Sequence, residues 1–349
     1  MSMTNAIQNM VAALVGSVPD DLHVTLRSPL THQSNRLYDV KHQDQHWIAK
    51  EYLHPDECKQ SSQREFDALH VLQDIDVAPI PIHLEAARDT HGPVVLYEYM
   101  AGEMWDRYSP TTEELAQLAQ VWLKVNDIPI DKLWPSKGMK RPLEGWISQA
   151  ENILQEYLQW TEVRFPQGVT AAQLCIQAWT KCHRLVSEIQ QLVTVYCFCK
   201  SDPRFGNVID RPDHRLGLID WEDSGLRDTA IDVADVMTHP NQEDLVSYDQ
   251  WQAFLQPYLS ERSKQDADLE KRVHLYSAIL PFFWLLTMIR REQQRIHKEH
   301  EAEGVFNELP ASVRLPRYLA RTLAWPSMDF SDQLDQVKEL RFFPTPGRM

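Results

Sequence analysis

The segment from Lys200 to Glu222 constrains the fold more than any other part of the sequence. It places Asn207 five residues after Asp202, and Asp220 thirteen residues after Asn207. Each of these polar residues lies at the edge of an apolar run, and a turn-forming Asp-Arg-Pro-Asp-His segment joins the second run to the third. The pattern predicts strand, polar loop, strand, tight turn and strand, an order that can gather all three side chains around one point.

Those three side chains suit a particular chemistry. The oxygens of Asn207 and Asp220 are hard ligands of the kind that Mg²⁺ prefers, while Asp202 can accept a proton from a hydroxyl. Together they predict phosphoryl transfer from a nucleotide to an alcohol, in which a metal neutralises charge beside a positioned base. The alternative is a loop in which Asp and Asn only make local turn hydrogen bonds.

Length and charge narrow the class of protein further. A chain of 349 residues can bury a large core, and we expect two lobes. The net charge of −15 disfavours nonspecific binding to nucleic acid or to an anionic membrane, and it fits a neutral or cationic substrate better. The sequence gives no indication of oligomeric state.

Several features predict a cytoplasmic protein. The first sixteen residues lack the basic end of a signal peptide and have the pattern of an amphipathic helix. The most apolar segment, Ser277 to Ile289, is expected to be too short to span a bilayer and contains Pro281. The five cysteines show no zinc-binding spacing, and a reducing compartment suits them.

Periodicity predicts an α+β fold with two lobes, a small one rich in strands and a larger helical one. The N-terminal nucleotide-binding lobe, residues 1–100, has a leading helix at 4–16, strands at 37–40, 47–52 and 94–99, and a helix at 56–76. The helical lobe, residues 101–349, has helices at 111–125, 146–160, 171–193, 248–259, 267–297 and 316–323, and an irregular end. It contains the catalytic loop (200–207) and the metal-binding strand end (218–222), and a hinge at 98–102 precedes it.

A lysine in the N-terminal lobe is a candidate phosphate ligand. Lys50 lies between Ile48 and Tyr52 on one face of a predicted strand, where burial is costly unless a charge meets it. Glu65 in the following helix is the candidate partner. Two alternatives remain open: Lys50 extends to solvent at a sheet edge, or Glu65 forms a capping box with Ser62.

The motifs in this order resemble those of the aminoglycoside phosphotransferase and choline kinase-like family, over roughly residues 20–240. That family typically has His-Gly-Asp-x-x-x-x-Asn, then an apolar strand and Ile-Asp-Trp/Phe-Glu. The resemblance implies a protein-kinase-like fold, with Asp202 as the catalytic base and with Asn207 and Asp220 as the Mg²⁺ ligands. ATP and Mg²⁺ are the implied cofactors.

The resemblance also implies roles in the N-terminal lobe. Lys50 would bind the nucleotide phosphates and Glu65 would be its helix partner. The segment from Val94 to Gly102 is similar to the family's hinge, so Glu98 and Met100 would hold adenine through their backbones. Residues 33–38 are similar to the phosphate-covering hairpin, where Ser34 would contribute its hydroxyl.

The sequence departs from the family at two places. Lys200 and Ser201 replace the usual His and Gly before Asp202, and no glycine occurs between residues 17 and 91, which includes the phosphate hairpin. Because glycine lets backbone N–H groups approach a phosphate closely, its absence motivates a second hypothesis. In that hypothesis the protein is a catalytically weak or inactive nucleotide-binding scaffold of the same fold.

The acceptor is the part that the sequence identifies least. The signatures His-Arg-Asp, Asp-Phe-Gly and Ala-Pro-Glu of protein kinases are missing, which favours a small-molecule hydroxyl acceptor, either a metabolite or an aminoglycoside-like compound. Arg204 is a candidate contact for the transferred phosphate. Glu222 and Asp228 are candidates for receiving a cationic substrate, and the alternative for all three is a solvated position.

Overall fold

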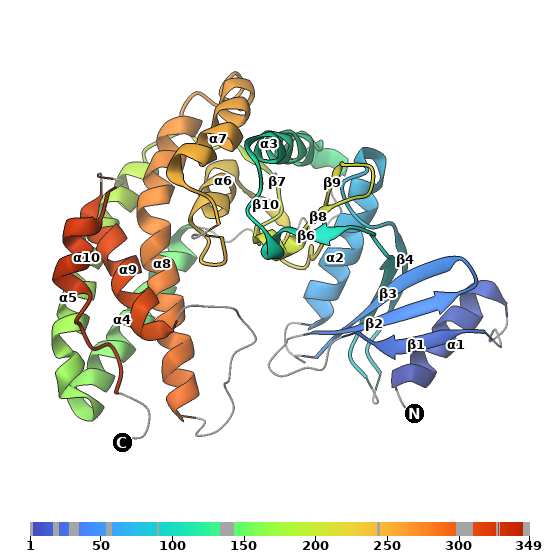
Figure 1. Cartoon of the computed structure of the whole chain (residues 1–349), viewed down its shortest axis with the longest axis horizontal. Coiled ribbons are helices and arrows are strands. Elements are labelled where there is room, and N and C mark those ends of the chain that lie inside the picture. The colour runs from blue at the N-terminus through green and yellow to red at the C-terminus, as the bar shows by residue number, and fades with distance from the viewer. Residues whose placement is uncertain are drawn as a thin grey trace. The chain divides into compact units, whose positions relative to one another are not determined.

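The computed structural model describes residues 3–16, 21–27, 35–53, 58–88, 91–132, 143–242, 245–297, 310–325, 327 and 329–344. The chain divides into two compact units (Figure 1). The first comprises Met1–Met139, Cys197–Arg227 and Tyr248–Tyr258, and the second comprises Lys140–Tyr196, Asp228–Ser247 and Leu259–Met349. The segment with the predicted catalytic loop belongs to the same unit as the N-terminal part of the chain. The lobe boundary at residue 100 stays a prediction.

The first unit is built around a five-stranded antiparallel sheet, with the strand order β1-β2-β3-β5-β4. Its strands are β1 (His23–Leu26), β2 (Asn35–His42), β3 (Gln45–Tyr52), β4 (Pro81–Glu85) and β5 (Val94–Glu98). The structure confirms the predicted strands at β2, β3 and β5. It adds β4, which the two prolines at its start concealed, since proline is tolerated at the first residue of a strand on a sheet edge.

A helix packs against each face of this sheet. The α1 helix (Met3–Val15) inserts Ile7, Met10 and Val11 against Trp47 and Ala49 of β3. The alternate residues of β3 point to the opposite face, where α2 (Cys58–Leu72) lies. Because side chains alternate along β3, one face of the strand is apolar and packs against α1, while the other face carries Lys50 towards α2.

The predicted catalytic loop, residues 200–207, lies between short strands of the first unit. The β6 (Glu103–Met104), β8 (Val208–Asp210) and β9 (Leu216–Leu218) strands form a three-stranded sheet, and β7 (Tyr196–Cys199) pairs with β10 (Gly225–Asp228). The α3 helix (Thr112–Asn126) begins with a capping box between Thr111 and Glu114, and its Asn126 donates to the carbonyl of Phe198 in β7. Most of α7 (Tyr248–Arg262) belongs to the same unit.

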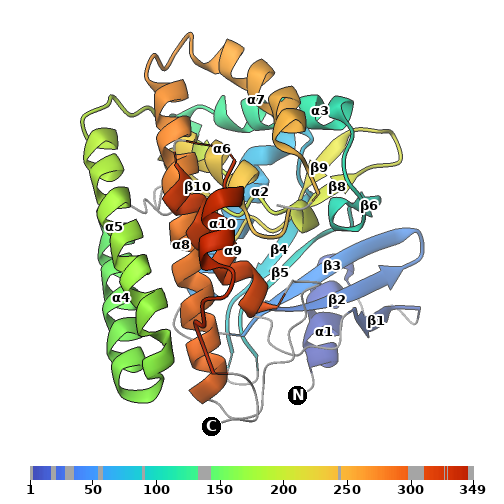
Figure 2. The ribbon, with the colours of Figure 1, turned by 60° about the vertical axis from the view of Figure 1, so that its left-hand side comes forward.

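The second unit is helical. It contains α4 (Leu143–Arg164), α5 (Val169–Ile189), α6 (Thr229–Thr238), α8 (Leu269–His297), α9 (Ala311–Ala324) and α10 (Ser331–Val337). Figures 1 and 2 show α4 and α5 side by side, and α8 packs against α4, α5, α6 and α9. The α10 helix corrects the prediction of an irregular chain end.

The α8 helix is the core helix of this unit. Within the described residues it is the one helix that is long and apolar enough to cross a membrane, over Leu269–Ile296, but 72% of its apolar window is buried. The prediction that its apolar segment is too short to span a bilayer was therefore wrong, since the helix meets the length that a membrane span needs. Its burial among four neighbouring helices is typical of the centre of a helical bundle.

Candidate active site

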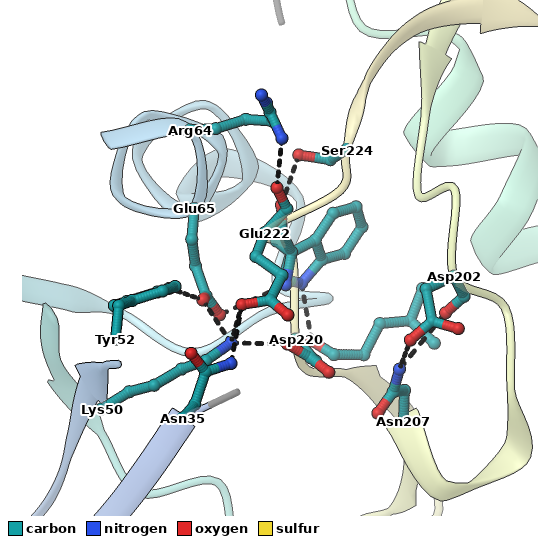
Figure 3. Close-up of polar contacts among 12 residues, drawn as sticks. Asn35, Lys50, Tyr52, Arg64, Glu65, Asp202, Asn207, Asp220, Glu222 and Ser224 are labelled. Atoms are coloured by element: carbon teal, nitrogen blue, oxygen red, sulfur yellow. Dashed lines mark hydrogen bonds and ion pairs between the residues drawn. The ribbon is translucent and has the colours of Figure 1, made fainter. Parts of the chain in front are cut away.

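Lys50 lies at the centre of the site, on the face of β3 that α2 covers (Figure 3). Only 3% of the residue is exposed, so the alternative in which it extends to solvent is wrong. A buried ammonium group needs compensating charge, and three carboxylates supply it. Its Nζ lies 2.7 Å from Glu65 Oε2, 2.5 Å from Asp220 Oδ1 and 3.1 Å from Glu222 Oε2.

These contacts fix the charge state at the centre of the site. Burial by itself would lower the pKa of Lys50, but the carboxylates of Asp220 and Glu65 outweigh it and raise the pKa well above its usual range. Burial likewise opposes ionisation of Asp220, whereas Lys50 and Arg204 hold the pKa of its carboxyl well below the usual range. Lys50 and Asp220 are thus a charged pair inside the first unit.

Glu65 links three elements of the site. Its Oε2 accepts hydrogen bonds from Lys50 and from the hydroxyl of Tyr52, and its Oε1 accepts the backbone N–H of Trp221 at 3.2 Å. The α2 helix begins at Cys58, so Ser62 and Glu65 lie inside it and the capping-box alternative is wrong. Glu65 therefore orients Lys50 and also anchors the chain that follows Asp220.

The two residues before Asp202 are both tied to the local backbone, Ser201 by its conformation and Lys200 by a hydrogen bond. Ser201 has a φ of +72°, a left-handed conformation that glycine adopts without strain and that serine adopts at a cost. Lys200 is buried and donates to the main-chain carbonyl of Asp220 at 2.5 Å, with its Nζ 5.2 Å from the centroid of the Trp221 ring. The departure at Lys200 thus has a defined structural role.

The structure brings Asp202 and Asn207 together, as predicted. Asn207 donates from Nδ2 to Asp202 Oδ2 at 2.9 Å and to the Asp202 carbonyl at 3.2 Å (Figure 3). This pair of acceptors fixes the orientation of the amide and leaves Asn207 Oδ1 free of Asp202, as an acceptor for Arg204. Asn207 is buried, while the side chain of Asp202 keeps 25% of its surface exposed, as a base that meets a substrate requires.

The oxygens of Asn207 and Asp220 face one point. The guanidinium group of Arg204 reaches Asn207 Oδ1 from Nε at 3.3 Å and Asp220 Oδ2 from Nη2 at 3.0 Å. One amide and one carboxylate oxygen that converge on a single cationic group are a donor set that fits Mg²⁺. The residues present are therefore compatible with the metal that the sequence predicts.

Glu222 is held by neighbours in the first unit, and its role as a substrate ligand stays a prediction. Its Oε2 accepts a hydrogen bond from Asn35 Nδ2 at 2.8 Å, and its carbonyl accepts one from Arg64 Nη1 at 2.7 Å. Burial raises the pKa of Glu222 to about 7 in spite of the nearby Lys50. Asn35, the first residue of β2, was not among the predicted site residues, because its contact with Glu222 joins segments 187 residues apart.

Asp228 does not fit the prediction of a substrate ligand. It is buried at the end of β10, where its side chain caps α6 by accepting the N–H of Ala230 at 2.9 Å. It also forms an ion pair with Arg272 of α8 at 3.0 Å, and Asp266 pairs with the same guanidinium at 2.6 Å. Because both oxygens of Asp228 are engaged within the second unit, we assign it a structural role.

The predicted hinge follows β5. The N–H of Glu98 donates to the carbonyl of Ile80, and that of Tyr99 donates to the carbonyl of His46. A backbone contact between Glu98 and a base would therefore use the Glu98 carbonyl oxygen, because its N–H is already engaged. The Met100 side chain lies against Gly217 of β9, where a Cβ would clash with its sulfur. The adenine-binding roles of Glu98 and Met100 stay predictions, and Ser34 lies outside the described residues.

The antiparallel sheet with a Lys–Glu pair, followed by a loop with Asp202, Asn207 and Asp220, defines a protein of the protein-kinase-like class. A sequence profile of the phosphotransferase enzyme family (APH) matches residues 26–273. The chain therefore belongs to this phosphotransferase family. No curated protein matches the sequence.

Solved structures with a similar fold include small-molecule kinases. The choline kinase LicA from Streptococcus pneumoniae is 18% identical with a TM-score of 0.58, and the match covers 93% of this chain and 99% of that one. A choline/ethanolamine kinase family protein from Mesorhizobium loti is 16% identical with a TM-score of 0.60, over 97% and 99% of the two chains. Spectinomycin phosphotransferase APH(9)-Ia, solved with ADP and spectinomycin, is 14% identical with a TM-score of 0.60, over 96% and 98%.

Proposed function

We propose that this protein is an ATP-dependent kinase that transfers the γ-phosphoryl group to a hydroxyl of a small molecule. The observation that carries this proposal is the convergence of Asp202, Asn207 and Asp220 beside the buried Lys50–Glu65 pair. Membership of the phosphotransferase family and the ADP bound by the spectinomycin phosphotransferase support the choice of nucleotide.

Asp202 is the residue that we assign to the acceptor. Its Oδ2 is held by Asn207, and its carboxylate keeps part of its surface exposed. In the proposed reaction it hydrogen-bonds the acceptor hydroxyl, orients the oxygen towards the γ-phosphorus and takes the proton as the new P–O bond forms. The β–γ bond breaks at the same time, and the bridging oxygen leaves with ADP.

Lys50, Asn207 and Asp220 are the residues that we assign to the nucleotide. Lys50, aligned by Glu65, binds phosphate oxygens, and the oxygens of Asn207 and Asp220 hold Mg²⁺. When bound, the metal neutralises the charge that develops on the phosphates. Because Lys50 pairs with Asp220 in the structure, nucleotide binding has to loosen that contact.

Two observations support a small-molecule acceptor: the missing protein-kinase signatures and the names of the similar structures. The sequence lacks the signatures of protein kinases, and the related folds include kinases named for choline, ethanolamine, spectinomycin and hygromycin B. A hydroxylated small molecule is therefore the proposed acceptor, and the acidic chain favours a cationic one.

Transfer of ³²P from γ-labelled ATP tests the proposal. The acceptor panel comprises choline, ethanolamine, thiamine, homoserine, sugars and aminoglycosides, each with Mg²⁺. We expect one class to be phosphorylated and expect Asp202→Ala to lower its turnover by at least about a hundredfold, since the base is lost. Asp213→Asn is the matched control, because Asp213 is an exposed aspartate in the β8–β9 turn. Equal turnover by D202A and the wild type would contradict the assignment.

A second candidate is a nucleotide-binding scaffold with little transfer activity. Two observations favour it: glycine is absent between residues 17 and 91, and both oxygens of Asp220 are occupied by the chain's own cations, Lys50 and Arg204. Calorimetric affinity for Mg·ATP, measured beside slow ATP hydrolysis, separates the candidates. Tight binding without turnover on any acceptor supports the scaffold.

A further inference from the structure

Arg204 contacts each of the three predicted catalytic and metal-binding residues. Its Nε lies 3.3 Å from Asp202 Oδ2 and 3.3 Å from Asn207 Oδ1, and its Nη2 lies 3.0 Å from Asp220 Oδ2. One planar cation thus spans the base and both oxygens that face the expected metal. The side chain is 34% exposed, so it has a path towards solvent.

These contacts leave Asp220 with a cation on each oxygen. Lys50 takes Oδ1 at 2.5 Å and Arg204 takes Oδ2 at 3.0 Å. Arg204 is therefore a fixed positive charge at the position where a divalent cation would need the same two oxygens.

We propose that Arg204 is a built-in counter-ion that occupies the metal position in the nucleotide-free protein and opposes metal binding there. The proposal rests on the proposed function, because it assigns a regulatory role at the same site. Arg204 has to leave Asn207 Oδ1 and Asp220 Oδ2 before a metal can take these oxygens. Asp202 is its third partner, so the released guanidinium can stay beside the base, near the transferred phosphate.

The proposal explains how the carboxylates of Asp202 and Asp220 stay close to one cation without a metal. The two groups would otherwise repel each other inside the first unit, and their repulsion is stronger than in bulk water because both are mostly buried. It also predicts that metal and nucleotide bind together. The phosphates would draw Lys50 away from Asp220, which leaves that carboxylate with less compensating charge, so a divalent cation gains more by binding there than it does without nucleotide.

Direct metal titration tests the proposal without nucleotide or acceptor. Mn²⁺, followed by electron paramagnetic resonance, is added to the wild type and to Arg204→Met, with Arg211→Met as the control. Arg211 is an arginine of the β8–β9 turn that pairs with Asp76 and Asp213. We expect R204M to bind one Mn²⁺ at least about tenfold more tightly than the wild type, and R211M to match the wild type. Adding N207A to R204M should abolish this gain.

Thermal unfolding gives a second readout. Without metal R204M should unfold at a lower temperature than the wild type, and Mg²⁺ should restore its Tm while it leaves the wild type unchanged. If R204M does not fold, Arg204→Gln, which keeps hydrogen-bond donors but no charge, takes its place in both measurements. Equal Mn²⁺ affinity of the neutral variant and the wild type would overturn the proposal. Failure of the proposed function is a separate result, because it is seen as absent phosphoryl transfer by the wild type.

Discussion

Lys200 donates a hydrogen bond of 2.5 Å to the main-chain carbonyl of Asp220, the residue whose carboxylate meets both Lys50 and Arg204. Asp220 has a φ of +64°, a conformation that few non-glycine residues adopt. The bond explains how this backbone is held: a buried ammonium group fixes the peptide, and the carboxylate is thereby directed into the site. Lys200 is therefore a positioning residue for Asp220.

Replacement of Lys200 should reduce catalysis more than it reduces stability. Lys200→Met removes the donor, and we expect phosphoryl transfer to fall by about ten- to a hundredfold, because a small displacement of Asp220 misplaces the metal ligands. Lys200→His keeps a ring N–H for the carbonyl and should retain several times more activity than K200M. Steady-state kinetics and the Tm of both variants check this. Equal losses of activity in K200M and K200H would show that the hydrogen-bond donor at residue 200 does not sustain catalysis.

Ser201→Gly should stabilise the protein, although serine to glycine is usually neutral or destabilising. Ser201 has a φ of +72°, where a side chain is strained and glycine is not. Relief of about 1–2 kcal/mol of left-handed strain exceeds the about 0.4–1 kcal/mol that the freedom of glycine in the unfolded chain costs. We therefore expect the free energy of unfolding to rise by about 0.5–1 kcal/mol, measured by urea denaturation. Ser201→Ala is the matched control: it removes the hydroxyl but keeps the Cβ, so it should show no gain. A glycine variant that is no more stable than the alanine variant would contradict this explanation.

The buried ion pairs of Arg272 should be critical for the second unit. Arg272 is fully buried between Asp228 and Asp266, so Arg272→Met leaves two carboxylates without their counter-ion. We expect a loss of about 3–5 kcal/mol in the free energy of unfolding.

The neighbouring residue gives the control for this change. Lys271 forms an exposed ion pair with Glu188, and Lys271→Met should change the free energy of unfolding by less than about 0.5 kcal/mol. Urea denaturation with a common m-value compares the two variants. Similar losses of the free energy of unfolding in both variants would show that burial does not make the Arg272 ion pairs more important than an exposed pair.

Two buried thiols of α5 should make stability fall at high pH. Burial raises the pKa values of Cys175 and Cys182 to about 12, against an ordinary value of 9.0. The folded chain therefore binds these two protons more tightly than the unfolded chain does. Their contribution to stability is complete below pH 9 and is lost as the pH rises from 9 towards 12, by up to about 1.4 kcal/mol per pH unit for each thiol.

Urea denaturation between pH 7 and pH 11 checks this dependence. A variant with Cys175→Ala and Cys182→Ala should lose free energy of unfolding less steeply above pH 9 than the wild type does. The slopes are compared, and not the absolute values, because alanine also removes packing. Parallel slopes in the two proteins would refute the assignment.

Local sequence patterns predicted those parts of the site whose residues lie within one short segment or on one face of an element. The period of two in β3 placed Lys50 on the face opposite Trp47 and Ala49, and the helical pattern of α2 brought Glu65 to the same face. The spacing from Asp202 to Asn207 predicted their contact because one short loop contains both residues. Such relationships depend on backbone geometry that the residues impose locally.

Contacts between distant segments were not predictable in this way. Asn35 binds Glu222 across 187 residues, and Asp228 pairs with Arg272 of α8 and does not face a substrate. An aspartate followed by a helix is equally compatible with a capping role and with an exposed acidic turn, so its burial had to come from the structure.

The sequence by itself determined that this chain carries the residues of a phosphotransferase, since the spacing of Asp202, Asn207 and Asp220 follows from one loop and two strands. Only the tertiary structure decided which cations neutralise Asp220, because the positions of Lys50 and Arg204 at its two oxygens depend on how the sheet, α2 and the catalytic loop pack together. The physical reason is the range of the interactions: periodicity acts over a few residues, whereas charge compensation in a buried site is settled by whichever groups the fold brings within hydrogen-bonding distance.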